Sequence, residues 1–171
     1  WIKPESVTAS TLFDIAGKWD GTNESYLLAQ FGDEIRMYVD SSSNYKTTDA
    51  ANLSTATWYY VAAVYNASAQ TVTIYINGID TTGTVTGTIP TSIGDDAGRF
   101  HIGAEDSTTT AANFYDGIVD EPRLYNRLLS AAEIRYLYNH GGPVAHYKMD
   151  EGSGSTAYDA SNIANDGTTT G

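Results

Sequence analysis

The chain has 171 residues, the size of one domain with a sizeable core, and it contains no cysteine, which excludes disulfides and cysteine-ligated zinc. Its formal net charge of −12 comes from 21 acidic and 9 basic residues, without the Lys or Arg cluster that nucleic acid requires. We therefore expect no nucleic acid binding. No apolar run approaches the roughly 18 residues that cross a bilayer, so we expect no membrane insertion either.

Short segments with apolar residues at every second position, separated by Gly, Asn, Asp and Ser, predict an all-β domain. In residues 34–40, Ile35, Met37 and Val39 share one face and Tyr38 lies on the other, which is typical of a half-buried strand. Residues 58–65 are apolar on both faces and predict a central strand that is covered on both sides.

Two further strand regions follow along the chain. Residues 71–77 alternate again, and the dipeptide Asn77-Gly78 predicts a tight type I′ hairpin into residues 79–84, because both of its residues tolerate positive φ angles. Residues 99–105 alternate through Phe100, Ile102 and Ala104. We expect these segments to form a sandwich.

One helix is predicted, over residues 130–139. Ser130 and Glu133 have the spacing of a capping box, in which each side chain accepts a hydrogen bond from the other residue's backbone. Ile134, Leu137 and Tyr138 then form an apolar stripe, and the helix should end at residues 140–142.

Several of these stretches together resemble the laminin G-like family of the concanavalin A-like jelly rolls. The resemblance is carried by residues 1–4 (Trp-Ile-Lys-Pro), 57–62, 74–78, 116–127 and 129–134. It implies an antiparallel jelly-roll β-sandwich with one short C-terminal helix, in an extracellular or cell-surface protein. We therefore expect a laminin G-like domain over residues 1–142 that lacks its usual opening strands.

Residues 143–171 resemble the segment that opens such a domain, although here they follow the closing helix. They either complete the same sandwich or begin a next repeat. In residues 144–150 the side chains of Ala145, Tyr147 and Met149 share one face, so we predict a strand beside residues 117–126 of the same chain or of a neighbouring subunit. The start at Trp1, without a signal peptide, indicates a piece of a longer protein.

The sequence predicts no enzyme. Retaining β-glucanases of this architecture carry a Glu-x-Asp-x-x-Glu strand, because side chains two apart face the same way. No Glu in this chain is followed two residues later by Asp, and the adjacent acidic pairs at 33–34 and 120–121 would point to opposite faces of a strand. His101, His140 and His146 lack metal-ligand spacing.

Carbohydrate binding would depend on aromatic rings, because the apolar face of a sugar stacks on an exposed ring. Trp19 lies in the polar stretch 17–21, where we expect an exposed loop, and it is the first ligand-binding candidate. Tyr38 and Tyr75 should project outward from their strands and Tyr115 should lie in a loop, although outward tyrosines also pack across strands.

The other predicted features concern structural tryptophans and a metal. Trp1 and Trp58 match family positions that are buried, so we expect structural roles for both. The resemblance also implies a structural calcium ion near the closing strand, where Asp120 matches the acidic position. Calcium needs six to eight oxygen ligands, so Asp120 alone could not hold it.

Two functions therefore remain open. The first is a non-catalytic extracellular binding or adhesion module that recognises a glycan or surface polysaccharide. The second is a structural repeat of a surface fibre, sheath or adhesin, in which an open sheet edge exchanges strands with a neighbouring subunit or repeat.

Overall fold

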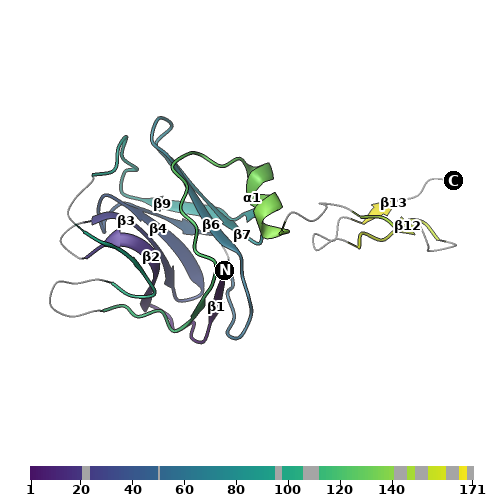
Figure 1. The fold of residues 1–171 in the computed structure, drawn as a ribbon, viewed down its shortest axis with the longest axis horizontal. Coiled ribbons are helices and arrows are strands. Elements are labelled where there is room, and N and C mark those ends of the chain that lie inside the picture. The colour runs from purple at the N-terminus through teal and green to yellow at the C-terminus, as the bar shows by residue number, and fades with distance from the viewer. Residues whose placement is uncertain are drawn as a thin grey trace.

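The computed structural model describes residues 1–20, 24–49, 51–94, 98–105, 112–140, 146–148, 154–160 and 166–168, and it builds them into antiparallel sheets with one short helix (Figure 1). The largest sheet has the strand order β10-β2-β3-β4-β5-β9. Its strands are β2 (Leu12–Trp19), β3 (Glu24–Phe31), β4 (Glu34–Val39), β5 (Tyr45–Thr48), β9 (Thr82–Thr86) and β10 (Phe100–Ile102).

The second layer is a three-stranded sheet of order β6-β7-β8, accompanied by the pair β1-β11. The elements outside the largest sheet are β1 (Ile2–Pro4), β6 (Val61–Asn66), β7 (Thr71–Ile76), β8 (Ile79–Asp80), β11 (Gly117–Val119), α1 (Ala131–Tyr138), β12 (Thr156–Ala157) and β13 (Gly167–Thr168). This architecture confirms the predicted all-β sandwich with one short helix.

The main core lies between the two layers. The predicted inward residues of β4, Ile35, Met37 and Val39, are at most 9% exposed and share a cluster with Val72, Ile74 and Ile76 of β7. Burying each such side chain stabilises the fold by about 1.5–3 kcal/mol. We call this side of the six-stranded sheet the inner face.

The tight turn and the helix form where the sequence predicts them, but the strand predicted over residues 79–84 is divided: β8 pairs with β7, whereas β9 joins the six-stranded sheet. Asn77 and Gly78 have φ angles of 51° and 76°, and the Asn77 side-chain oxygen accepts a hydrogen bond from the backbone N–H of Tyr60 at 2.9 Å. At α1, the Ser130 hydroxyl accepts from the Glu133 N–H, and the Glu133 carboxylate accepts from the Ser130 N–H, which completes the predicted capping box.

Two strand predictions need correction. The apolar segment predicted as a central strand forms β6, which lies at the edge of its sheet with all six residues half-buried. The segment around Phe100 and Ile102 forms the edge strand β10, and both side chains are 48% exposed. The same apolar composition that suits a doubly covered strand is also found at an edge, because composition alone does not report which neighbours are present.

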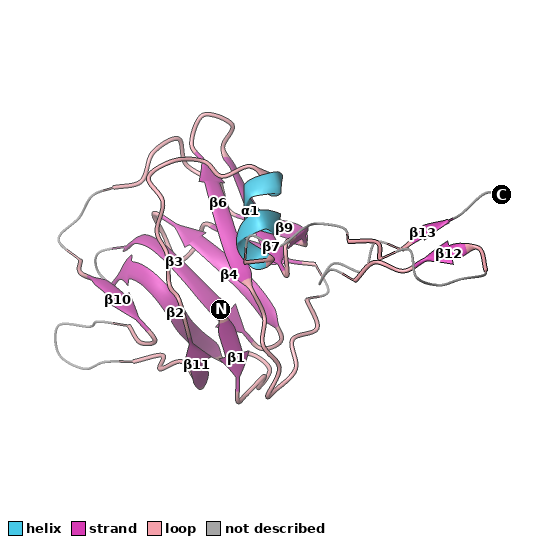
Figure 2. Ribbon diagram, turned by 45° about the vertical axis from the view of Figure 1, so that its right-hand side comes forward, coloured by secondary structure: helices cyan, strands magenta, loops and turns pink. Residues whose placement is uncertain are grey.

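The described part of the C-terminal segment does not join the sandwich of its own chain. Tyr147 forms a bridge with Asp159, and β12 pairs with β13, so these residues make a separate small unit beyond α1 (Figures 1 and 2). The strand β11, beside which the segment was predicted to lie, pairs with β1. Residues 146–148 therefore do not take the same-chain alternative of the prediction, pairing with a neighbouring subunit stays a prediction, and 144, 145, 149 and 150 lie outside the described residues.

No helix in the described part of the chain is long and apolar enough to cross a membrane.

Candidate functional site

The four aromatic residues predicted to bind a ligand are buried. Trp19 and Tyr38 are each 6% exposed, Tyr75 is 8% exposed and Tyr115 is 9% exposed. The expectation of an exposed loop ring is therefore wrong for Trp19. Tyr38 and Tyr75 do project away from the main core and Tyr115 does lie outside the strands, but all three are buried, and stacking on a sugar needs a free ring face. Any part that these rings play in binding would be to support neighbours that do reach the solvent.

Three of these rings lie in different surroundings. Trp19 does not lie in a loop, because β2 continues through it and pairs it with Glu24 of β3. Tyr75 points away from the core residues Ile74 and Ile76 and lies near α1: the charge of Arg135 acts on it, and a Cβ at Gly78, in the adjoining turn, would lie 3.2 Å from Arg135. The Tyr115 hydroxyl has no hydrogen-bond partner among the described residues, and burial raises its pKa.

The rings of Trp19 and Tyr38 belong to an aromatic layer on the outer face, the side of the six-stranded sheet turned away from the second sheet. The centroids of Trp19 and Tyr38 lie 5.8 Å apart, and those of Tyr38 and Tyr45 lie 4.9 Å apart. Beneath them Leu27 and Ala29 are almost completely buried. Ring contacts of this kind contribute about 0.5–1.5 kcal/mol each beyond the area they bury.

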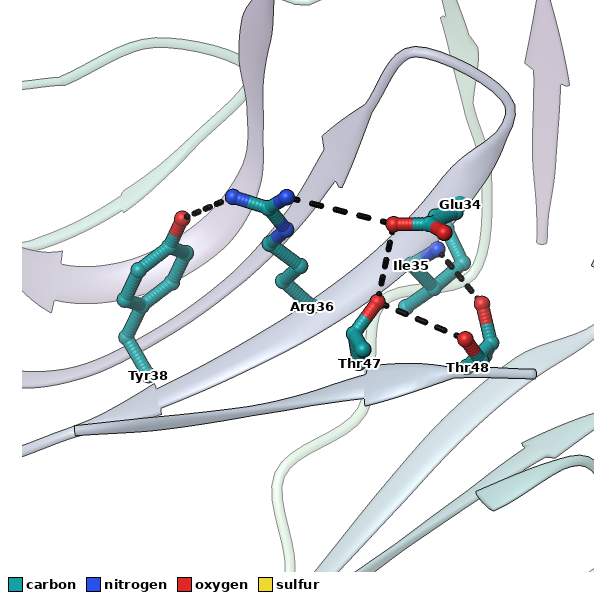
Figure 3. A network of polar contacts seen from close by, with 6 residues as sticks. All are labelled: Glu34, Ile35, Arg36, Tyr38, Thr47 and Thr48. Carbon is teal, nitrogen blue, oxygen red and sulfur yellow. Dashed lines mark hydrogen bonds and ion pairs between the residues drawn. The ribbon is translucent and has the colours of Figure 1, made fainter. Parts of the chain in front are cut away.

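A cation covers part of this layer. The Arg36 guanidinium carbon lies 3.5 Å from the centroid of the Phe31 ring and 4.8 Å from that of Tyr45. Its Nη1 donates a hydrogen bond of 3.4 Å to the Tyr38 hydroxyl, and its Nη2 lies 3.9 Å from the Glu34 carboxylate (Figure 3). Arg36 is therefore held over the rings by contacts on several sides.

The remaining polar groups come from the neighbouring strand. The Thr47 hydroxyl of β5 donates to the Glu34 carboxylate at 3.0 Å, and Arg36 and Thr47 are direct partners in the register of β4 and β5 (Figure 3). The Glu34 side chain is 37% exposed and that of Arg36 is 16% exposed. We call Phe31, Glu34, Arg36, Tyr45 and Thr47 the outer-face site; it presents a carboxylate, a guanidinium, a hydroxyl and two half-buried rings.

The outer face also carries a buried acid near the other edge of the sheet. Asp14 of β2 is completely buried, and neither of its carboxylate oxygens has a hydrogen-bond partner among the described residues. His101 lies 4.0 Å away, at the limit of an ion pair. Burial raises the pKa of Asp14 to about 7, with a further contribution from the charge of Glu105.

This arrangement bears on catalysis. The structure places Asp14 of β2 and Glu34 of β4 on the same face, with β3 between the two strands. A search for acidic residues close together in the sequence could not reveal this relation, because it depends on the strand order. Asp14 lies across β3 from Arg36, two residues along β4 from Glu34, so the backbone positions of Asp14 and Glu34 are farther apart than the two strand spacings of about 10 Å. Because Asp14 is 0% exposed, its carboxyl group cannot reach a substrate in this conformation.

The calcium expectation gains no ligand set from the described residues. Asp120 is exposed, its carboxylate accepts a hydrogen bond from the backbone N–H of Glu121 at 2.8 Å, and its carbonyl oxygen accepts from the Trp1 ammonium. No group of three or more His, Cys, Asp or Glu that could hold a metal occurs in the part of the chain that the structure describes. Calcium at Asp120 therefore stays a prediction that depends on the resemblance.

The outer-face site was not among the residues predicted from the sequence, and a second tryptophan besides Trp19 differs from expectation. Trp58, expected to be buried, is 41% exposed. Arg36, Glu34 and Thr47 carry no motif, but their alternation in β4 and β5 already put their side chains on one face. The signal that could have found them is the polar face opposite the predicted core face of residues 34–40.

Comparisons with known proteins agree with this architecture. A laminin G family model, described as the concanavalin A-like lectin/glucanases superfamily, matches residues 1–135. No curated protein matches the chain significantly. The chain is similar to a crystal structure from Bacteroides ovatus ATCC 8483, described as a "putative carbohydrate binding protein", with a TM-score of 0.61 and 20% identity. The match covers 99% of this chain and 50% of that one, so the chain spans half of that protein's length, and the likeness is one of fold.

Proposed function

This chain belongs to the concanavalin A-like lectin/glucanases superfamily, and we propose that it is a non-catalytic carbohydrate-binding module of an extracellular or cell-surface protein. The observation that carries the proposal is the outer-face site, where the Tyr45 ring lies beside a carboxylate, a guanidinium and a hydroxyl on neighbouring strands. The fold, and its similarity to a protein described as a "putative carbohydrate binding protein", support the same class of ligand.

The chemistry of the site suits a sugar. A sugar presents one apolar ring face and several hydroxyls, each able to donate and to accept a hydrogen bond. The Glu34 carboxylate accepts, the Arg36 guanidinium donates, and the Thr47 hydroxyl does either. The ring of Tyr45 provides apolar surface next to these groups.

The contacts within the site also hold it in place before a ligand arrives. Arg36 stays over two rings and against Glu34, so its side chain has little rotamer freedom left to lose on binding. Ordering a long side chain otherwise costs about 0.5–1.5 kcal/mol of binding free energy. A rigid scaffold of two β-strands thus favours a preorganised site.

Binding rather than hydrolysis is supported by the position of the acids. A glycosidase needs two carboxyl groups that both reach the scissile bond. On the outer face, Glu34 reaches the solvent while Asp14 is completely buried. We therefore expect the module to hold a glycan without cleaving it.

The proposal is tested by a glycan array followed by calorimetric titration of the best ligand. Tyr45→Ala and Glu34→Gln should each weaken binding by about tenfold or more, equivalent to about 1.4 kcal/mol. Tyr136→Ala is the matched control, because Tyr136 lies on α1, is 60% exposed and is not part of the outer-face site. Equal binding by all three variants, or no glycan bound by the wild-type chain, would contradict the proposal.

A second candidate function is a structural repeat of a surface fibre, sheath or adhesin. The observation that favours it is separate from the outer face: among the described strands, β6 pairs with β7 on one side only. An open edge can recruit a strand from another chain.

A further inference from the structure

The outer-face site leaves mainly hydrogen-bond acceptors for a ligand, and Glu34 provides the first of them. Its Oε2 accepts a hydrogen bond from the Thr47 hydroxyl at 3.0 Å and lies 3.9 Å from Nη2 of Arg36. Its Oε1 accepts no hydrogen bond from the residues that the structure describes (Figure 3). A carboxylate oxygen can only accept, so Oε1 suits a ligand that donates.

The Thr47 hydroxyl offers a second acceptor. A hydroxyl carries one proton and two lone pairs, and the proton of Thr47 is directed to the Glu34 carboxylate at 3.0 Å. The carbonyl oxygen of Thr48, its alternative partner, lies farther away at 3.4 Å. The lone pairs of Thr47 therefore remain for a ligand, next to Oε1 of Glu34.

Arg36, the cation of the site, has few donors left for a ligand. Its Nε is buried and has no hydrogen-bond partner among the described residues. Its Nη1 donates to the Tyr38 hydroxyl at 3.4 Å, and its Nη2 faces Glu34. The Arg36 side chain is 16% exposed, against 37% for that of Glu34, so the charge that the site presents to the solvent is mainly a carboxylate.

The surroundings of the site are acidic as well. Asp33 immediately precedes β4 and Asp49 immediately follows β5, and both residues are exposed. Because β4 and β5 are antiparallel, these two acids lie at the same end of the strand pair as Glu34. Lys46 of β5 is the partner of Met37, an inner-face residue, so Lys46 points away from the site. An anionic ligand would therefore approach carboxylates at this end of the sheet.

On the basis of the carbohydrate-binding function proposed above, we propose that the ligand of the outer-face site is an uncharged glycan and that the site rejects acidic glycans. The hydroxyls of the sugar donate to Glu34 and Thr47, and its apolar face lies on the Tyr45 ring. A uronate or sulfate group offers acceptors only, so it forms no hydrogen bond where it meets these oxygens. It also brings a negative charge beside Glu34, and like charges in contact oppose binding.

The first experiment exposes the full chain to an array of uncharged glycans and of glycans that carry uronate, sialic acid or sulfate. The bound glycans should be uncharged, and an acidic counterpart with the same backbone should bind at least about tenfold more weakly. Preferential binding of acidic glycans would overturn this inference and leave the carbohydrate-binding function standing. If the chain binds no glycan at all, the proposed function is wrong and the inference falls with it.

The second experiment tests whether Glu34 is the origin of the selectivity. Glu34→Gln keeps the shape of the side chain and one acceptor oxygen, removes the charge and adds an N–H donor. Calorimetric titration compares the best uncharged glycan with the same glycan in which one sugar is replaced by a uronate. The uronate glycan should bind Glu34→Gln at least about threefold more tightly than it binds the wild type, while the uncharged glycan loses affinity.

The matched control for this titration is Glu121→Gln. It changes the net charge of the chain by the same amount, but Glu121 lies outside the outer-face site, is 48% exposed and pairs with Arg123 at 3.1 Å. Its affinity for both glycans should equal that of the wild type. An equal gain for the uronate glycan in both variants would assign the selectivity to the net charge of the chain. That result, or no gain in Glu34→Gln, overturns the inference.

Discussion

The two faces of the six-stranded sheet are both buried, but by different means. The inner face is covered by a second sheet, so Ile35 and Val39 meet apolar side chains from β7 and are 0% exposed. The outer face is covered by its own long side chains: Trp19 and Tyr38 lie over the sheet, and Arg36 lies against the rings. Alternation directs successive side chains to opposite faces of the sheet, and the two faces differ in what covers them.

The difference teaches how one strand can stabilise a fold and present a site. A face that is covered by another sheet offers nothing to a ligand. A face that is covered by its own rings keeps their edges and the attached polar groups near the solvent, as for Glu34 at 37% exposure. The variants below test whether the outer face is as tightly built as the inner face.

The largest effect is expected for Trp19→Ala. Truncating a buried aromatic costs about 3–5 kcal/mol of unfolding free energy, as much as a large apolar truncation on the inner face. Urea denaturation of Trp19→Ala beside Ile35→Ala, whose side chain lies on the inner face and is 0% exposed, makes the comparison direct. A loss below about 1 kcal/mol for Trp19→Ala would mean that the outer face is a loose surface layer.

An intermediate effect, of the opposite sign, is expected for Asp14→Asn. Burial raises the pKa of Asp14 to about 7 in the folded state, above its unfolded value near 4. The folded state therefore binds the proton more tightly, and the contribution of Asp14 to stability is fully present below pH 4 and is lost as the pH rises to about 7.

Asp14→Asn removes this titration. The variant should be more stable than the wild type above pH 7, by on the order of 2–4 kcal/mol, and the difference should shrink toward pH 4. Thermal unfolding of both proteins across this pH range checks the sign. A wild type that gains stability relative to the variant as the pH rises would show that Asp14 is ionised and paired in the folded protein.

The smallest effect is expected for Arg36→Met, which keeps the length of the side chain and removes the cation. The variant should lose about 0.5–2 kcal/mol, because the guanidinium interacts with the faces of Phe31 and Tyr45. Arg36→Lys separates charge from shape, since an ammonium lacks the planar contact. If both variants unfold at the wild-type denaturant concentration, the guanidinium does not contribute to the cover of the outer face.

Much of the fold could be predicted because its signals are local. The strand containing Ile35 follows from alternation, the turn at Asn77 from its tolerance of positive φ, and the helix start at Ser130 from a four-residue capping pattern. The eight-residue strand β2 gave no such signal. Its register shifts between Asp14 and Ala16, and an irregular register interrupts the alternation on which strand prediction depends.

The sequence by itself determined the class of fold, the hairpin, the helix and the inner side of β4, because each depends on residues within a few positions of one another. Only the tertiary structure decided which outward rings are buried. The exposure of Trp19 depends on Tyr38 and that of Tyr75 depends on α1, and both partners come from distant parts of the chain. The tertiary structure also decided the site: Glu34, Arg36 and Thr47 meet because β4 and β5 pair in one register, and a shift by one residue would turn Thr47 to the other face.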